Sequence, residues 1–231
     1  MNLNRSGLVC STLLLLVLCA FETAAAQSYH VETAGTPPPE ELSSAVRDAL
    51  AAQALRVVSP KGALLEIWLR KAIPAKAGTT QELGISYGQL AEGALVGVVR
   101  FPGEVNDYRQ QRVKAGVYTL RYALIPVDGN HQGVAPNRDF LLISPAAADA
   151  NPATISREAL LNLSRKSIGT GHPSVWSLPA TDSAPATLPA LKHQEDGDLW
   201  VLQFAVPIEP AGGAPSKAVL SLVILGHAPE A

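Results

Sequence analysis

The chain has 231 residues, of which 47% are hydrophobic and 16% are charged, and its formal net charge at pH 7 is −2. This balance is typical of a well-packed globular protein and excludes a disordered one. A nearly neutral chain without a block of like charges offers no electrostatic footprint for nucleic acid or for an anionic membrane. We therefore expect neither of these as a partner.

The N-terminal segment has the pattern of a secretory signal peptide. Arg5 precedes an apolar run over 13–20, and three alanines at 24–26 precede Gln27. A positive start, a short apolar centre and a cleavage site of small residues define such signals. The apolar run is too short to span a bilayer, and no later stretch approaches ~18 apolar residues. The sequence predicts a soluble exported protein, periplasmic or secreted, with no transmembrane segment after cleavage.

Both cysteines, Cys10 and Cys19, lie within the predicted signal peptide, 1–26. The mature chain would then hold no thiol, so it could form no disulfide and offer no cysteine nucleophile or metal ligand. Its fold would rest on core packing alone. The remaining length suits one domain. We expect that domain over 40–231, after a flexible leader, 27–39, that ends in three prolines.

Hydrophobic periodicity predicts the elements in chain order. Between 40 and 54, apolar residues recur at three- and four-residue steps, as on one face of a helix. From 65 to 69, apolar and polar residues alternate as in a strand. A second helix is expected over 156–166, where Ser156 can cap the N-terminus. The other predicted strands are 94–101, with Gly97 as a bulge or close-approach point, 117–122, 139–143, 175–178, 199–206 and 217–225.

Short strands separated by Gly/Pro turns, without βαβ alternation, favour antiparallel sheets. We therefore expect a mainly β fold: an antiparallel, jelly-roll-like β-sandwich with one N-terminal helix and one short peripheral helix. The stretch 181–191, rich in proline and alanine, is expected to be a loop. The last strand, 217–225, is apolar on both faces, which predicts a central position in its sheet.

Residues 84–88 match the G-x-S-x-G motif of hydrolase nucleophile elbows, with Ser86 as the nucleophile. The motif carries chemistry only where a strand leads into it and a helix follows, because that strained turn exposes the hydroxyl. Here 74–81 makes a poor strand, and 89–93 is too short for the helix. A turn or a strand edge is therefore the favoured interpretation, and a Ser86 hydrolase stays an alternative.

The loop 127–139 is richer in functional side chains than a turn requires. It carries Asp128 and His131, and it ends in Arg138 and Asp139 at the start of the next strand. Turn-forming residues between two strands first of all predict a hairpin loop. Because ligand-contacting residues concentrate on loops, we also expect these four side chains to contact a ligand.

A second glycine-rich loop, 169–174, carries His172. If the fold brings the two loops together, His172 joins His131 and a carboxylate of Asp128 or Asp139 in one ligand site. The same set could bind Zn(II), Cu(II) or Mn(II). No pair of histidines has a metal-ligand spacing, so the metal and any other cofactor stay unknown.

Several stretches of the mature chain carry a resemblance: 62–71, 114–122, 126–131, 138–140, 164–166 and 172–173. In them the chain resembles an uncharacterised family of predicted exported bacterial proteins. The resemblance implies a bacterial origin and export. It implies no activity, cofactor or catalytic residue.

These observations together predict a periplasmic binding or accessory protein, with a small molecule or an envelope component as its ligand. We expect binding rather than catalysis. Two alternatives stay open. One is a metal-assisted hydrolase that uses the loop histidines, and the other is a structural envelope protein without a small-molecule site.

Overall fold

The computed structural model describes residues 29–76, 82–128, 131, 135, 137–181, 183, 185–210 and 214–228. The predicted signal peptide lies outside the described residues, as do several positions of the loop 127–139. Among the described residues, no helix is long and apolar enough to cross a membrane.

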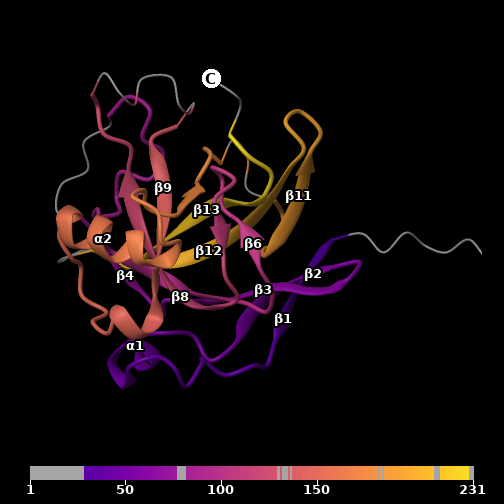
Figure 1. The fold of residues 1–231 in the computed structure, drawn as a ribbon, viewed down its shortest axis with the longest axis horizontal. Coiled ribbons are helices and arrows are strands. Elements are labelled where there is room, and N and C mark those ends of the chain that lie inside the picture. The colour runs from indigo at the N-terminus through magenta and orange to yellow at the C-terminus, as the bar shows by residue number, and fades with distance from the viewer. Residues whose placement is uncertain are drawn as a thin grey trace, which may run out of the picture.

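The fold is mainly β, with antiparallel sheets and few helices (Figure 1). The first sheet has seven strands in the order β1-β2-β3-β5-β8-β9-β10, and each neighbouring pair in it is antiparallel. Its strands are β1 (His30–Ala34), β2 (Ala54–Ser59), β3 (Gly62–Leu69), β5 (Leu95–Phe101), β8 (Gly116–Leu124), β9 (Asp139–Pro145) and β10 (Val175–Ser177).

The second sheet has the order β11-β12-β13, and the short strand β4 pairs in parallel with the end of β12. A separate hairpin pairs β6 with β7. The strands are β4 (Ile73–Pro74), β6 (Val105–Asn106), β7 (Arg112–Val113), β11 (Ala190–Gln194), β12 (Leu199–Glu209) and β13 (Ser216–Leu225). The helices are α1 (Ser44–Asp48) and α2 (Arg157–Ser164), with the 3-10 turns η1 (Ala146–Ala148) and η2 (Arg165–Ser167).

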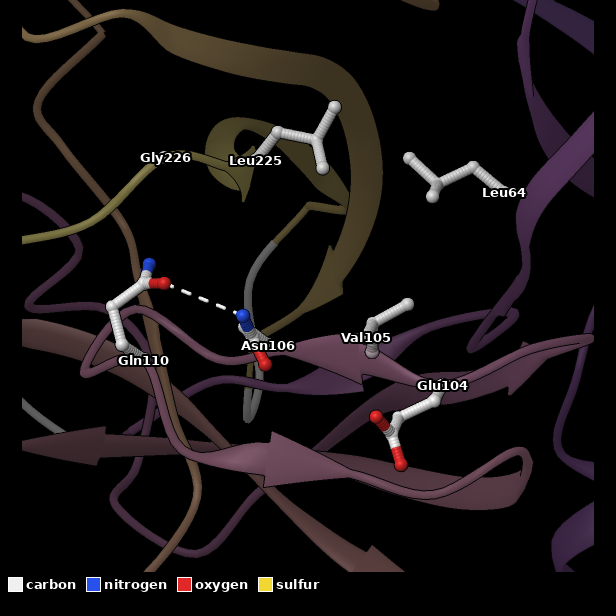
Figure 2. Close-up of a pocket in the computed structure, with 7 residues that line it drawn as sticks. All are labelled: Leu64, Glu104, Val105, Asn106, Gln110, Leu225 and Gly226. Atoms are coloured by element: carbon white, nitrogen blue, oxygen red, sulfur yellow. Dashed lines mark hydrogen bonds between the residues drawn. The ribbon is translucent and has the colours of Figure 1, made fainter. Parts of the chain in front are cut away.

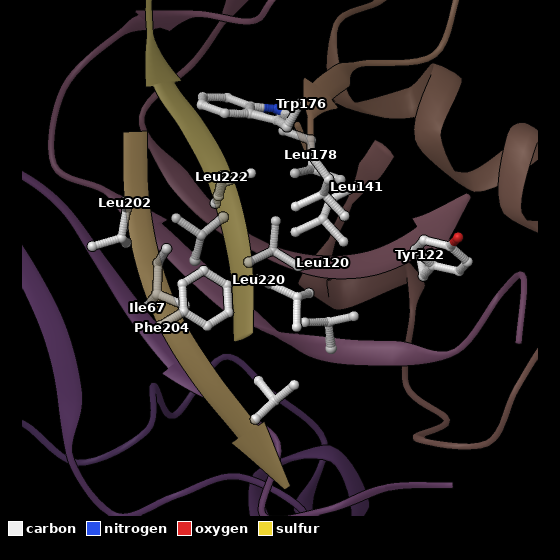
Figure 3. Close-up of a cluster of buried hydrophobic side chains, with 14 of the residues drawn as sticks. Ile67, Leu120, Tyr122, Leu141, Trp176, Leu178, Leu202, Phe204, Leu220 and Leu222 are labelled. Atoms are coloured by element: carbon white, nitrogen blue, oxygen red, sulfur yellow. The ribbon is translucent and has the colours of Figure 1, made fainter. Parts of the chain in front are cut away.

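The two sheets share one apolar core (Figure 3). Because side chains alternate along a strand, each sheet turns every second residue toward the other. The first sheet contributes Ile67, Leu120 and Leu141, and the second contributes Leu202, Phe204, Leu220 and Leu222. Burying one such side chain stabilises the fold by about 1.5–3 kcal/mol. This shared core is the largest apolar cluster among the described residues.

The prediction of a close approach at Gly97 is confirmed. The pairing of β5 with β8 is irregular between Leu95 and Gly97. A Cβ atom at Gly97 would lie 2.5 Å from the carbonyl oxygen of Trp68. Such a contact is too short for any side chain, so the backbone of β3 can pass here only over a glycine.

The second predicted helix is also confirmed. It forms as α2, and the Ser156 hydroxyl caps it by accepting a hydrogen bond from the backbone N–H of Ala159 at 3.2 Å. The helix expected over 40–54 is shorter than predicted, because α1 ends at Asp48. Leu50 and Ala54 keep the helical spacing, but they are buried in the same apolar cluster as α1 from extended backbone. The hydrophobic pattern therefore extends beyond the end of the helix.

Two strands were not predicted: β1 forms within the predicted flexible leader, and β11 begins within the predicted loop 181–191 and continues to Gln194. β1 pairs with β2 over His30–Ala34, and β11 pairs with β12 over Ala190–Gln194. Each lies at one end of its sheet order. Edge strands with exposed polar residues carry a weak period-two pattern, which explains why both were missed.

The prediction that the last strand is central is wrong. Among the described strands, β13 pairs only with β12 and ends the sheet order. Its outer edge is covered by side chains instead. The Tyr87 hydroxyl accepts a hydrogen bond from the backbone N–H of Ser221 at 3.1 Å, and the Thr181 hydroxyl donates to the carbonyl of Val219 at 3.2 Å. Both faces of β13 are apolar because each face packs against a different apolar cluster.

Candidate functional site

Asp139, one of the predicted ligand residues, is completely buried at the start of β9. Its carboxylate accepts hydrogen bonds from the backbone N–H groups of Ser86 and Tyr87, at 2.8 and 3.1 Å. A third comes from the Tyr122 hydroxyl at 2.6 Å. Burial, followed by this bond to Asp139, raises the pKa of Tyr122 well above its ordinary value, so the phenol stays a donor. Asp139 therefore holds the chain around Ser86 against the first sheet.

Arg138 also has partners within the protein. Its Nε donates to the carbonyl of Ile125 at 3.1 Å, and its guanidinium lies 3.5 Å from the Glu82 carboxylate. Its backbone N–H donates to the carbonyl of Gly84 at 2.9 Å. The Arg-Asp pair at the end of the loop thus joins the segment around 84–88 to β9.

The described residues around Ser86 lack the context of a nucleophile elbow. Residues 82–93 form turns and a single β-bridge at Leu90, with neither a strand leading into Gly84 nor a helix after Gly88. The motif match therefore lies on a turn, as its flanking residues suggest. The Ser86 hydrolase has no support from this part of the structure.

The two predicted loop histidines have different surroundings. His131 Nδ1 lies 2.7 Å from Asp128 Oδ1, and both side chains are about half exposed. His172 is exposed in a loop whose Thr170 hydroxyl donates to the Gln111 side chain at 3.1 Å. Within the described part of the chain, no group of three or more His, Cys, Asp or Glu side chains could hold a metal ion. A shared site of the two histidines stays a prediction.

Several loops nevertheless meet in one small apolar cluster on the face of the second sheet opposite the shared core. Its buried members are Tyr108, Phe140, Val201 and Val223, and Ile125, Ala135 and Ala228 pack against them. These residues bring the loop 127–139, the β6–β7 turn and the chain after β13 to one region. The backbone supports this arrangement, since the backbone carbonyl of Tyr108 accepts a hydrogen bond from the N–H of Ala228 at 2.9 Å.

A groove of about 380 Å³ lies beside this cluster, between the β6–β7 hairpin and the ends of β3 and β13 (Figure 2). Its lining combines aliphatic side chains, two amides and one carboxylate: Leu64, Val105, Leu225, Asn106, Gln110 and Glu104. An apolar surface with a few placed polar groups is the usual composition of a small-molecule site.

Asp107 fixes the turn that carries the two amides. Only 1% of Asp107 is exposed, and its Oδ1 accepts hydrogen bonds from the backbone N–H groups of Arg109 and Gln111 at 2.9 and 2.8 Å. Its Oδ2 accepts from the Gln111 side chain at 2.9 Å and from the backbone N–H of Val175 at 3.0 Å. An aspartate that bonds the backbone ahead of it is a common way to set a turn. Here it also attaches the turn to β10.

Gln110 occupies the left-handed backbone region, with φ of 60°. This conformation costs a residue other than glycine about 1–2 kcal/mol. The bonds to Asp107 hold it in place, and its Oε1 accepts a hydrogen bond from the Asn106 amide at 3.3 Å (Figure 2). Residues held in such conformations cluster at ligand-binding positions.

Asn106 and Gln110 were not identified from the sequence. The only signal is a polar stretch without glycine between two short β segments, from Asn106 to Gln111. A turn without glycine can require a strained residue, but the pattern does not say which residue carries the strain. The groove itself has no sequence signal, because its walls are far apart along the chain.

Comparison of the chain with family models, curated proteins and solved structures gave no match. A fold alone does not define a function. The functional conclusion therefore rests on the groove and on the residues that shape it.

Proposed function

We propose that this chain is an exported binding protein of β-sandwich architecture whose ligand lies in the groove beside the β6–β7 hairpin. Two antiparallel sheets with a common core support the sandwich. The N-terminal pattern of a charged start, an apolar centre and three alanines supports export to the periplasm. The resemblance to exported bacterial proteins agrees with that location.

The single observation that carries the binding role is the strained backbone of Gln110. Asp107 is buried to hold this turn, and the result is an amide presented at a groove with an aliphatic floor. At a turn position with positive φ, glutamine is less stable than glycine, so its presence here is not explained by stability. A ligand that hydrogen-bonds to the Gln110 side-chain amide would explain why glutamine occupies this position.

The lining also indicates the chemistry of the ligand. Leu64, Val105 and Leu225 favour an apolar portion, and the amides of Asn106 and Gln110 can both donate and accept hydrogen bonds. Glu104 is the only charged residue of the lining, and its carboxylate is already paired with Arg112 at 3.2 Å, so the groove favours a neutral ligand over an anionic one. A small molecule or an envelope component that has both an apolar portion and hydrogen-bonding groups would fit this groove.

The polar loops belong to the same region in this proposal. The loop of His172 is hydrogen-bonded to the β6–β7 turn through Thr170 and Gln111. Asp128 and His131 follow Ile125, which packs in the cluster beside the groove. We propose these three polar side chains as outer contacts of a larger ligand, while Arg138 and Asp139 support the loop from within.

The test is a ligand screen by NMR on the mature protein, with a panel of neutral and cationic metabolites and cell-envelope fragments. Compounds that bind the wild type are then titrated against Gln110→Ala and against Gln53→Ala, an exposed glutamine outside the groove. We expect Gln110→Ala to weaken binding about 5- to 10-fold, since one hydrogen bond contributes about 1 kcal/mol, and Gln53→Ala to leave it unchanged. An empty screen, or equal affinities for all three proteins, would contradict the proposal.

A further inference from the structure

A second hollow, of about 120 Å³, lies on the second sheet. Leu202 and Phe204 point into the shared core, so Gln203 between them points to the opposite face of β12. The hollow lies on that face, partly covered by the chain around Pro179. Its polar lining consists of Ser183, Lys192, Gln194, Gln203 and Ser221.

The Gln203 side chain is buried there without a full set of hydrogen bonds. Only 5% of the residue is exposed. Its Nε2 donates to the Ser221 hydroxyl at 3.1 Å, and its Oε1 has no partner among the described residues. A buried amide atom without a partner destabilises the folded state. Stability alone therefore does not explain why a glutamine occupies position 203.

The neighbouring side chains do not supply the missing bond, because they bond to one another. The Ser221 and Thr181 hydroxyls lie 2.8 Å apart, and Thr181 lies 3.0 Å from the Tyr87 hydroxyl. Tyr87 donates to the carbonyl of Pro179 at 2.7 Å. If the Gln203 amide turns over, Oε1 accepts from the Ser221 hydroxyl, the Thr181 hydroxyl donates to Ser221 instead of Val219, and Nε2 becomes the atom without a partner. In either orientation the Gln203 amide keeps at least one N–H without an acceptor among the described residues.

Lys192 brings a positive charge to the same hollow. It lies opposite Val201 in the register of β11 and β12, and therefore on the same face as Gln203. Among the described residues, its side chain forms neither an ion pair nor a hydrogen bond. The lining contains no carboxylate among the described residues. The available groups are the Lys192 ammonium, the amides of Gln194 and Gln203 and the Ser183 hydroxyl, all of which can donate to an anion.

We propose that this hollow is a binding site for a small anion, with carboxylate or phosphate oxygens as the recognised group. Lys192 supplies the charge, and the turned-over amide of Gln203 donates Nε2–H while its Oε1 accepts from Ser221. The volume admits an ion of a few non-hydrogen atoms and is too small for a nucleotide. The site is separate from the groove and does not depend on the proposed function.

The first experiment measures thermal unfolding in increasing acetate and, separately, phosphate, at constant ionic strength set with chloride. An anion that binds only the folded state raises Tm with the logarithm of its concentration. The variants are Lys192→Gln and, as a matched control, Lys217→Gln, which removes an exposed lysine of β13 outside the hollow. Both positions are exposed, so neither change endangers the fold.

We expect the wild type and Lys217→Gln to respond alike. Lys192→Gln should lose about 10-fold or more in affinity, the usual effect of a charge-assisted hydrogen bond. A response to acetate alone identifies a carboxylate site, and a response to phosphate alone identifies a phosphate site. A Tm rise of the same size in Lys192→Gln would be a general salt effect and would overturn the proposal, as would no response in the wild type.

The second experiment addresses Gln203. Gln203→Leu fills the position with an apolar side chain and removes the amide without a full set of hydrogen bonds. We therefore expect a folded protein whose Tm does not rise with the anion. In the wild type, the NMR signals of the Gln203 side-chain amide should shift on titration with the anion that raises Tm. An unshifted amide, or wild-type affinity in Gln203→Leu, would contradict the proposed contact.

Discussion

The left-handed conformation of Gln110 allows its cost in stability to be measured separately from its role in binding. Glycine adopts φ near +60° without steric cost, whereas alanine keeps the strain and loses the amide. We therefore expect Gln110→Gly to be more stable than Gln110→Ala by about 1 kcal/mol. Urea unfolding of the two variants measures this difference. If the alanine variant is the more stable one, the residue is not strained and the argument for the groove is lost.

The phenol of Tyr122 predicts how stability depends on alkaline pH. Burial and the bond to Asp139 raise its pKa in the folded state, so the folded protein holds this proton where the unfolded chain, with an ordinary pKa near 10, releases it. The stabilisation is complete below about pH 10 and is lost as the pH rises further, with a slope of up to about 1.4 kcal/mol per pH unit.

Tyr122→Phe tests this prediction through unfolding free energies between pH 8 and pH 11. The variant should lose about 1–3 kcal/mol at pH 8, because Asp139 loses a donor, and it should depend less on pH above 10 than the wild type. Tyr29→Phe controls for the loss of a hydroxyl outside the core. An unchanged alkaline slope in Tyr122→Phe would contradict the assignment.

Among the elements, β13 shows how a fold protects the edge of a sheet. An unpaired edge offers its N–H and C=O groups to other chains. Here the hydroxyls of Tyr87 and Thr181 bond to the edge of β13. A turn distant in sequence thus replaces a neighbouring strand, which allowed a sequence that is apolar on both faces to end its sheet order.

Removing this cover should loosen the edge. Tyr87→Phe deletes the acceptor of the Ser221 N–H, so we expect a loss of about 1–3 kcal/mol and faster hydrogen exchange at Ser221. Tyr118→Phe is the matched control, since it deletes a tyrosine hydroxyl whose bond, to the carbonyl of Lys114, lies away from β13. Unaltered exchange at Ser221 in Tyr87→Phe would show that the hydroxyl does not cover the edge.

For the whole molecule, export is the prediction with the clearest consequence. Produced with its own N-terminus in a Gram-negative host, the chain should be recovered from the periplasm starting at Gln27. Small side chains at 24 and 26 suit signal cleavage, so Ala26→Lys should leave the precursor uncleaved. Mass spectrometry of both proteins measures this directly. An intact wild-type chain in the cytoplasm would contradict it.

The sequence was sufficient for the elements whose pattern is local. Ser156 marked the start of α2, Gly97 marked the close approach of β5 to β3, and alternating apolar residues predicted most of the long strands. These features depend on neighbours along the chain, where capping and side-chain alternation act directly. Edge strands such as β1 and β11 lack that pattern, so local reasoning missed them.

The candidate sites depend on contacts between distant segments, which no local pattern encodes. Arg138 and Asp139 looked like ligand residues from their position in a polar loop, yet their partners lie near Ser86, about fifty positions earlier. The groove and the hollow likewise join residues from separate strands and turns. The sequence by itself determined the mainly β class through its periodicity. Only the tertiary structure decided which polar side chains are used inside and which remain available, because burial is settled when the sheets pack.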